Sequence, residues 1–235
     1  MKNLLLILLT ATVSISQAQQ ADYSKWNDIL TKYVSTSGKV NYSGIKKNKA
    51  SLDAAITAFA SATPAAGASK DAKLAYYMNL YNAYTIKLIV DNYPTTSITK
   101  LEGGKPWDKK YIPLGKATVS LNYIENDVLR KMGDPRIHFG INCASVSCPK
   151  LYNKAFTAAN TDGVLASLAK EFVNDGSKNN IAANKLVVSE IFNWFGGDFK
   201  TSKTSIIDFL NQYSKVKINA TAPMTHLSYN WNLNE

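Results

Sequence analysis

The sequence predicts an α+β fold, a mainly helical single domain with a small, mostly antiparallel sheet. Three observations support this prediction: helical spacing dominates the pattern of apolar residues, the candidate strands are few and short, and no repeat or long low-complexity segment divides the chain. Of the 235 residues, 46% are hydrophobic and 19% are charged. This composition is typical of a globular domain that can bury a core without the help of disulfides.

The first eighteen residues have the pattern of a cleavable secretory signal. Lys2 supplies a basic start, an apolar run covers 4–13, and Ser16-Gln17-Ala18 fits a cleavage site of small residues. The apolar run is much shorter than the roughly twenty residues that cross a bilayer as a helix. We therefore expect a signal peptide over 1–18, one domain over 19–235, no transmembrane segment, and a periplasmic or secreted protein.

The first half of the mature chain is predicted to be helical. Periodicity indicates helices over 23–33 and 49–59, and a stretch rich in small residues at 61–69 connects the second of them to a third helix. Asp71 can cap this third helix. We expect the helix to end near Val90, because the proline of Asn92-Tyr93-Pro94 disfavours helical geometry in the residue before it.

The second half alternates short strands with helices. Gly115-Lys116 separates two runs that fit a hairpin, 111–114 and 118–121. The elements predicted after this hairpin are a helix over 123–131, a strand over 137–142, a helix over 162–174, a strand over 185–189 and a helix over 205–213.

The excess of basic over acidic residues indicates which kind of ligand the protein could bind. Lys and Arg number 27 against 17 Asp and Glu, which gives a net charge of +10. The lysines are scattered and lack the interleaved aromatic residues of a nucleic-acid site. We therefore expect a small-molecule or polymeric ligand, with an anionic one favoured by the charge, and no nucleic acid. The sequence has no GxGxxG, Walker, HExxH, GxSxG or EF-hand pattern, so it predicts no cofactor and no metal.

Two carboxamides lie on the apolar face of the predicted helix 71–90. At about 100° per residue, Asn79 and Asn82 share a face with Ala83 and Ile86. A buried amide without partners costs about 1–3 kcal/mol, so each amide needs backbone groups or a ligand. Two interpretations follow: the amides tie the helix to an irregular neighbouring loop, or they bind a substrate.

One of the two histidines and both cysteines lie between His138 and Cys148. A thiol becomes a useful nucleophile when a neighbouring base or a positive dipole lowers its pKa. Cys143 follows the predicted strand, at a turn of small residues. Residues five apart point to opposite faces of a strand, so His138 and Cys143 can meet only if the chain bends between them, for example at Gly140.

The same two cysteines can instead form a disulfide. An exported protein permits one, and the short loop between Cys143 and Cys148 would contribute only about 2 kcal/mol by the chain-entropy argument. The CxxxxC spacing differs from that of zinc sites and of CxxC redox motifs, and a metal would need a distant further ligand. The reactive thiol and the disulfide both stay open.

Several blocks of the sequence together resemble the domain of unknown function 547 family. The blocks are LAYYMNLYNAYT at 74–85, LNYIE at 121–125, HFGINCASVSCP at 138–149, VSEIFNW at 188–194 with DF at 198–199, and YNWNLN at 229–234. The resemblance implies no particular activity. The positions that it marks are Asn79, Asn82, Glu125, His138, Cys143 and Trp194. Asn126 departs from the family, which often has a histidine there.

The residues allow a thiol-dependent hydrolase or acyl transferase. In this hypothesis Cys143 attacks an amide or ester carbonyl, and His138 acts first as base and then as acid. Glu125 would orient the imidazole, and Asn79 or Asn82 would donate to the developing oxyanion.

The alternative is a non-catalytic envelope binding module with a Cys143–Cys148 disulfide. A papain-like arrangement, with Cys143 served by the downstream His226, is a further option, because such constellations are defined by geometry more than by position. Trp107, Trp194 and Trp231 are interpreted as core anchors with a polar edge rather than as a ligand platform.

Overall fold

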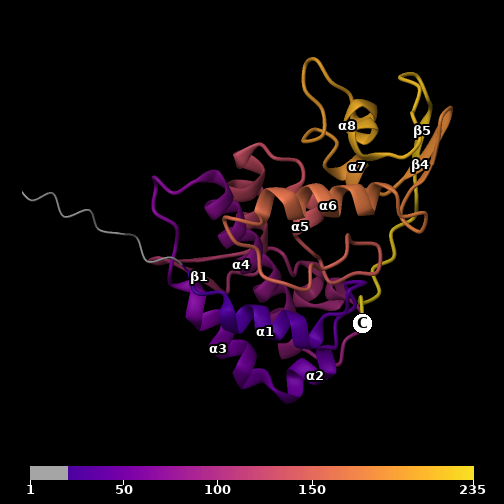
Figure 1. The fold of residues 1–235 in the computed structure, drawn as a ribbon. Coiled ribbons are helices and arrows are strands. Elements are labelled where there is room, and N and C mark those ends of the chain that lie inside the picture. The colour runs from indigo at the N-terminus through magenta and orange to yellow at the C-terminus, as the bar shows by residue number, and fades with distance from the viewer. Residues whose placement is uncertain (1–20) are drawn as a thin grey trace, which may run out of the picture.

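A computed structural model of the chain describes residues 21–235. The predicted signal peptide, 1–18, lies outside the described residues. Figure 1 shows the N-terminal helices at one end of the molecule and the last helices and strands at the other, with the C-terminal segment running back toward the first helices. Among residues 21–235, none of the helices combines the length and the apolar character needed to span a bilayer.

The first part of the domain is a group of four helices, of which the last is the longest. They are α1 (Ser24–Tyr33), α2 (Tyr42–Lys47), α3 (Lys49–Ala60) and α4 (Lys70–Asp91). The Ser69 side chain caps α4 by accepting from the Ala72 amide at 3.1 Å, so the helix starts slightly before the predicted cap at Asp71. Because α4 packs against α2, α3, α5 and α6, apolar residues occupy most of its circumference.

Apart from α6, the elements in the rest of the chain are short. They are η1 (Ile98–Lys100), η2 (Glu102–Gly104), β1 (Ile112–Leu114), β2 (Ala117–Val119), η3 (Tyr123–Leu129), η4 (Arg130–Met132), α5 (Ile137–Gly140), α6 (Thr161–Val173), β3 (Asn180–Ala182), β4 (Lys185–Val188), α7 (Ile191–Trp194), α8 (Ile206–Tyr213) and β5 (Met224–His226). Of these, η3 is a π-helix, and η1, η2 and η4 are 3₁₀ turns.

The strands form two small sheets. β1 and β2 are an antiparallel hairpin that pairs Ile112 with Val119. In the second sheet β4 pairs antiparallel with β3 and parallel with β5, with Leu186 opposite Met224. The α+β class and the small, mostly antiparallel sheet are therefore confirmed.

The predicted strand over 137–142 is wrong, because Ile137–Gly140 forms the short helix α5. All four of its residues are buried, and the helix packs against α4 and α6. A short apolar run that is buried on all sides has no polar face, so its periodicity cannot separate a strand from a helix. The segment predicted as a helix over 123–131 is helical, but it consists of a π-helix followed by a 3₁₀ turn.

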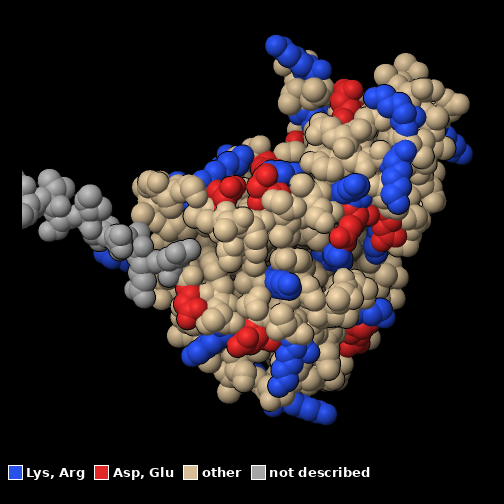
Figure 2. Space-filling model, viewed as in Figure 1, with Lys and Arg blue, Asp and Glu red and all other residues tan. Residues whose placement is uncertain are grey.

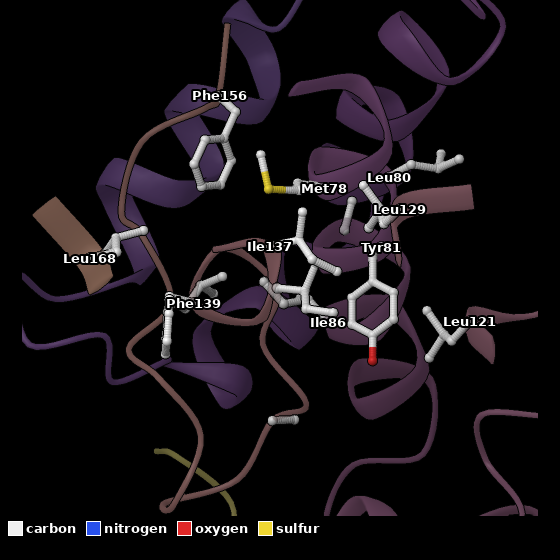
Figure 3. Packing of buried hydrophobic residues seen from close by; sticks show 14 of the residues in the cluster. Met78, Leu80, Tyr81, Ile86, Leu121, Leu129, Ile137, Phe139, Phe156 and Leu168 are labelled. Atoms are coloured by element: carbon white, nitrogen blue, oxygen red, sulfur yellow. The ribbon is translucent and has the colours of Figure 1, made fainter. Parts of the chain in front are cut away.

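The core lies where α4, α5 and α6 meet. Figure 3 shows Met78 and Ile86 of α4 close to Ile137 and Phe139 of α5, with Phe156 nearby. At Gly140 an added Cβ would lie 2.5 Å from the Met78 sulfur and 2.9 Å from Leu165. Only glycine therefore permits this close approach of α5 to its neighbours.

The segment after β5 connects the two ends of the molecule. The Val40 amide donates to the carbonyl of Asn234 at 2.8 Å, and the Leu233 amide donates to Thr96 at 3.1 Å. Ser145 and Leu233 form an isolated antiparallel bridge. This tail therefore fixes the turn that carries the cysteines against the N-terminal helices.

Charged side chains are dispersed over the surface. Figure 2 shows Lys and Arg spread across the visible face with Asp and Glu among them, as the scattered lysines in the sequence suggested. Several lysines are paired; Lys87, for example, contacts Asp53 at 2.7 Å and Asp91 at 3.3 Å.

Candidate functional site

A cavity of about 230 Å³ brings most of the predicted site residues together. Glu125, His138, Cys143 and Cys148 all line it. His138 and Cys143, which could meet only if the chain bends between them, therefore border the same cavity. The bend after α5 makes this possible, because α5 ends at Gly140 and the chain changes direction before Cys143, whereas a straight strand would point residues five apart to opposite faces.

His138 is held by Asp198, a residue that the sequence analysis did not select. The imidazole Nε2 lies 2.8 Å from Asp198 Oδ2, and the ring stacks on Phe195 at a centroid distance of 4.1 Å. The His138 side chain is only 1% exposed. The carboxylate and the aromatic ring together fix the orientation of the imidazole.

Asp198 also accepts two hydrogen bonds from Arg130. Arg130 Nε and Nη2 donate to its two oxygens at 2.6 and 2.8 Å, which is a bidentate pair. Burial of Asp198 opposes ionisation, but the hydrogen bonds from His138 and Arg130 outweigh it and hold the pKa of this carboxyl well below its usual range. Asp198 is therefore a carboxylate at neutral pH.

The role predicted for Glu125, to orient the imidazole, is not seen, because Asp198 is the hydrogen-bond partner of His138. Glu125 accepts from the Tyr81 hydroxyl at 3.1 Å on the π-helix η3. Burial raises the pKa of Glu125 and outweighs the opposing influence of His138, Tyr81 and Arg130. Glu125 thus lines the cavity as a carboxyl group that resists ionisation.

Cys143 lies in a tight turn that the next residue stabilises. Ala144 adopts a positive φ of 59°, and its amide donates to Asn142 Oδ1 at 2.8 Å. The Cys143 sulfur lies 3.3 Å from the hydroxyls of both Ser145 and Tyr229. Three groups therefore surround this sulfur, since Cys148 Sγ is also close, at 2.7 Å.

The two thiols differ in acidity. Burial alone would raise the pKa of Cys143, but hydrogen bonds from Cys148, Ser145 and Tyr229 outweigh it, so this pKa is lowered. Burial and the neighbouring Cys143 raise the pKa of Cys148 well above its ordinary value. Cys143 is therefore the thiol that more readily becomes a thiolate.

The Cys143–Cys148 disulfide of the alternative prediction is not formed, and both residues are free cysteines. Their sulfurs are 2.7 Å apart, whereas a disulfide bond is about 2.05 Å long. The turn brings the thiols together without joining them.

Asn79 and Asn82 tie α4 to neighbouring loops and do not line the cavity. Asn79 bonds both the amide and the carbonyl of Phe156, at 3.1 and 2.8 Å. Asn82 donates to the Gly140 carbonyl and accepts from the Asn142 amide, both at 2.9 Å. The loop-anchoring interpretation is confirmed, and neither carboxamide is available to an oxyanion.

His226 does not line this cavity either. It lies in β5 opposite Val188. The papain-like option with His226 as the base is therefore not supported by the geometry.

Aromatic rings form one wall of the cavity, in contrast to the interpretation of the tryptophans as core anchors. Trp107, Trp194, Tyr229 and Trp231 all line it, and Trp194 is 46% exposed. Trp231 packs against Trp107 at 5.6 Å and against Tyr229 at 4.5 Å. The rings come from three distant segments, so the wall exists only in the folded chain.

Three residues of the site escaped the sequence analysis as site residues: Arg130, Asp198 and Tyr229. Asp198 and Tyr229 lie in blocks that carry the family resemblance, and Arg130 is one of only two arginines. These features could have drawn attention to the three residues, but they do not reveal which side chains the residues contact. Among residues 21–235 no group of three or more His, Cys, Asp or Glu side chains is arranged to hold a metal ion.

Comparison with known families matches residues 65–173 to the model described as "Protein of unknown function, DUF547". The matched range begins five residues before α4, ends with α6, and contains Glu125, His138, Cys143 and Cys148. No curated protein and no solved structure matches the chain. The resemblance inferred from the sequence blocks is confirmed.

Proposed function

We propose that this protein, whose residues 65–173 match the DUF547 family of unknown function, is a thiol-dependent hydrolase or acyl transferase acting on an amide or ester. One observation carries the proposal: Cys143 and a histidine oriented by a carboxylate line the same cavity. A nucleophile, a base and a group that orients the base are the parts that such catalysis requires.

Each part of the site has a role in this reaction. The Cys143 thiolate attacks the carbonyl carbon, and a thioester forms as the amine or alcohol leaves. Because Nε2 of His138 is held by Asp198, Nδ1 is the ring nitrogen assigned to proton transfer. It takes the proton of the Cys143 thiol, gives that proton to the leaving group, and later takes one from water or from an acceptor. Tyr229, 3.3 Å from the sulfur, replaces the two asparagines as the proposed donor to the oxyanion.

The test is acylation of the fully reduced protein by a series of p-nitrophenyl esters, followed by intact and peptide mass spectrometry. We expect a covalent acyl adduct on Cys143 and none in Cys143→Ser. His138→Ala should lower the turnover rate by about 10²–10⁴-fold, since that is the usual contribution of a positioned acid–base group. Val146→Ala is the matched control, because this side chain in the same turn is 42% exposed.

Iodoacetamide labelling at pH 5 and pH 7 adds an independent measurement. Cys143 should react faster than Cys148, and the difference should be larger at the lower pH, because only Cys143 has a lowered pKa. An absence of any acyl adduct, with Cys143 no more reactive than Cys148, would contradict the proposal.

A second candidate, a non-catalytic envelope binding module, is favoured by the aromatic wall. Exposed rings such as Trp194 give a ligand a large apolar face to pack on. In that case the tryptophan fluorescence would respond to a ligand while Cys143 stays inert to esters.

A further inference from the structure

The turn at 143–148 holds two thiols in a position that acyl transfer alone does not need. Cys143 Sγ and Cys148 Sγ are 2.7 Å apart, and the Cys143 amide donates to Cys148 Sγ at 2.9 Å. Since a disulfide needs about 2.05 Å between the sulfurs, a shift of less than an ångström would allow the bond. The turn is therefore already shaped for both a dithiol and a disulfide.

The two cysteines are unequal in their surroundings. Cys143 is partly exposed and faces the aromatic-walled cavity. Cys148 also lines this cavity but is only 7% exposed. Ser145 and Tyr229 place hydroxyl groups 3.3 Å from Cys143 Sγ, where they stabilise a thiolate. One thiol is thus positioned to attack and the other to resolve a mixed disulfide.

We propose that Cys143 and Cys148 form a dithiol that reduces disulfides of small thiol compounds or peptides by exchange. The Cys143 thiolate attacks one sulfur of a disulfide R–S–S–R′, which forms a mixed disulfide with R and releases R′–S⁻. The Cys148 thiol then attacks Cys143 Sγ and loses its proton to the departing R–S⁻. The substrate disulfide gains two electrons, and the protein is left with a Cys143–Cys148 disulfide.

This activity rests on the same nucleophile as the proposed function, and it would regulate that function. Oxidation consumes the Cys143 thiolate, so acyl transfer stops until a thiol reductant restores it. A second cavity, of about 570 Å³, gives such a thiol a route to the pair, because Cys148 lines both cavities.

The test uses the full chain, reduced and freed of reductant, with glutathione disulfide as the probe. Free thiols and the intact mass are measured over time after acid quenching. We expect the wild-type protein to release two equivalents of glutathione and to lose two hydrogens in mass. Cys148→Ser should stop at a mixed disulfide on Cys143, and Cys143→Ser should form no intramolecular disulfide. Val146→Ala is again the matched control and should behave as the wild type does.

The outcomes separate this inference from the proposed function. If the reduced wild type keeps both thiols in glutathione disulfide but still forms an acyl adduct with esters, the exchange activity is overturned and the proposed function stands. If the internal disulfide forms but no ester acylates Cys143, the proposed function fails alone. The wild-type measurement needs no substitution, so a poorly folded variant cannot obscure the result. Cys148→Ala is a second variant that can replace Cys148→Ser.

Discussion

Asp198 fixes the orientation of the buried His138 ring by a hydrogen bond. It contacts the imidazole on one side and accepts two hydrogen bonds from Arg130 on the other. His138, Cys143 and Glu125 were each predicted from sequence and do line the cavity. Asp198 was not, because it lies sixty residues after His138 and local spacing carries no information about such a pair.

Asp198→Asn should destabilise the protein in a pH-dependent way. The folded pKa of Asp198 is depressed, so its contribution to the free energy of unfolding is complete above the unfolded pKa of about 3.9 and is lost as the pH falls toward the folded value. We expect a loss of about 2 kcal/mol at pH 7, as for hydrogen bonds to a charged group, and a smaller loss at pH 3. Urea unfolding at both pH values measures it.

Asp127→Asn is the control for this experiment. Asp127 pairs with Lys131 at 2.8 Å, but its side chain is 52% exposed. Exposed pairs contribute about 1 kcal/mol or less. An equal effect of Asp198→Asn at pH 3 and pH 7 would show that the carboxylate charge is not what stabilises the site.

Glu125→Gln should have the opposite pH dependence. Burial raises the folded pKa of Glu125, so the stability that its neutral form supplies is present below the unfolded pKa of about 4.3 and is lost as the pH rises through the folded value. Glutamine copies the neutral form. We therefore compare the melting temperature of Glu125→Gln with that of the wild type at each pH. The difference should be more favourable to the variant at pH 8 than at pH 4.

Glu171→Gln is the matched control, because the Glu171 side chain is 51% exposed. Its melting temperature should not follow the same trend with pH. A Glu125→Gln variant whose stability relative to the wild type falls between pH 4 and pH 8 would contradict a raised pKa at Glu125.

At the scale of elements, α5 decides the geometry of the site. The sequence indicated apolar residues at Ile137 and Phe139 and a bend at Gly140, but it indicated a strand where a helical turn is found. Ile137, His138 and Phe139 are all buried, so the alternation of apolar and polar side chains could not distinguish a strand from a helical turn. The predicted bend between His138 and Cys143 is real, although its cause is a helix end rather than a bulge.

Gly140→Ala should destabilise the domain by about 1–3 kcal/mol, the usual cost of overpacking a filled core. The new methyl group would lie 2.5 Å from the Met78 sulfur and 2.9 Å from Leu165. Gly163→Ala is the control, because no atom lies within 4 Å of its added Cβ in α6. That control should be neutral or stabilising, since alanine favours helix by about 1 kcal/mol. Equal effects of the two substitutions in urea unfolding would refute the close approach.

At the scale of the whole molecule, the C-terminal tail joins the helical and the strand-containing parts. Tyr229 and Trp231 line the cavity, and Asn234 accepts from the buried Tyr42 hydroxyl at 2.7 Å. Asn234 also donates to the carbonyl of Gly38 and to Asn142 Oδ1, both at 3.3 Å. Asn234 thus joins the tail, an N-terminal loop and the residue directly before Cys143.

Asn234→Ala should lower the free energy of unfolding by about 1–3 kcal/mol, because it leaves the buried Tyr42 hydroxyl without its acceptor. It should also increase the reactivity of Cys143 toward iodoacetamide, since the tail covers the cysteine turn. Asn230→Ala is the control, because Asn230 is exposed on the same tail. Unchanged stability and labelling in Asn234→Ala would show that the tail does not hold the site together.

The sequence by itself determined the helices with clear periodicity, the hairpin and the chemical character of the segment that carries His138 and Cys143. These properties depend on neighbours along the chain, and local spacing records them. Only the tertiary structure decided that Asp198 orients His138, that Asn79 and Asn82 anchor loops, and that the two thiols stay close but unbonded. Those outcomes depend on packing between segments that are far apart in the chain, where burial determines which polar groups meet.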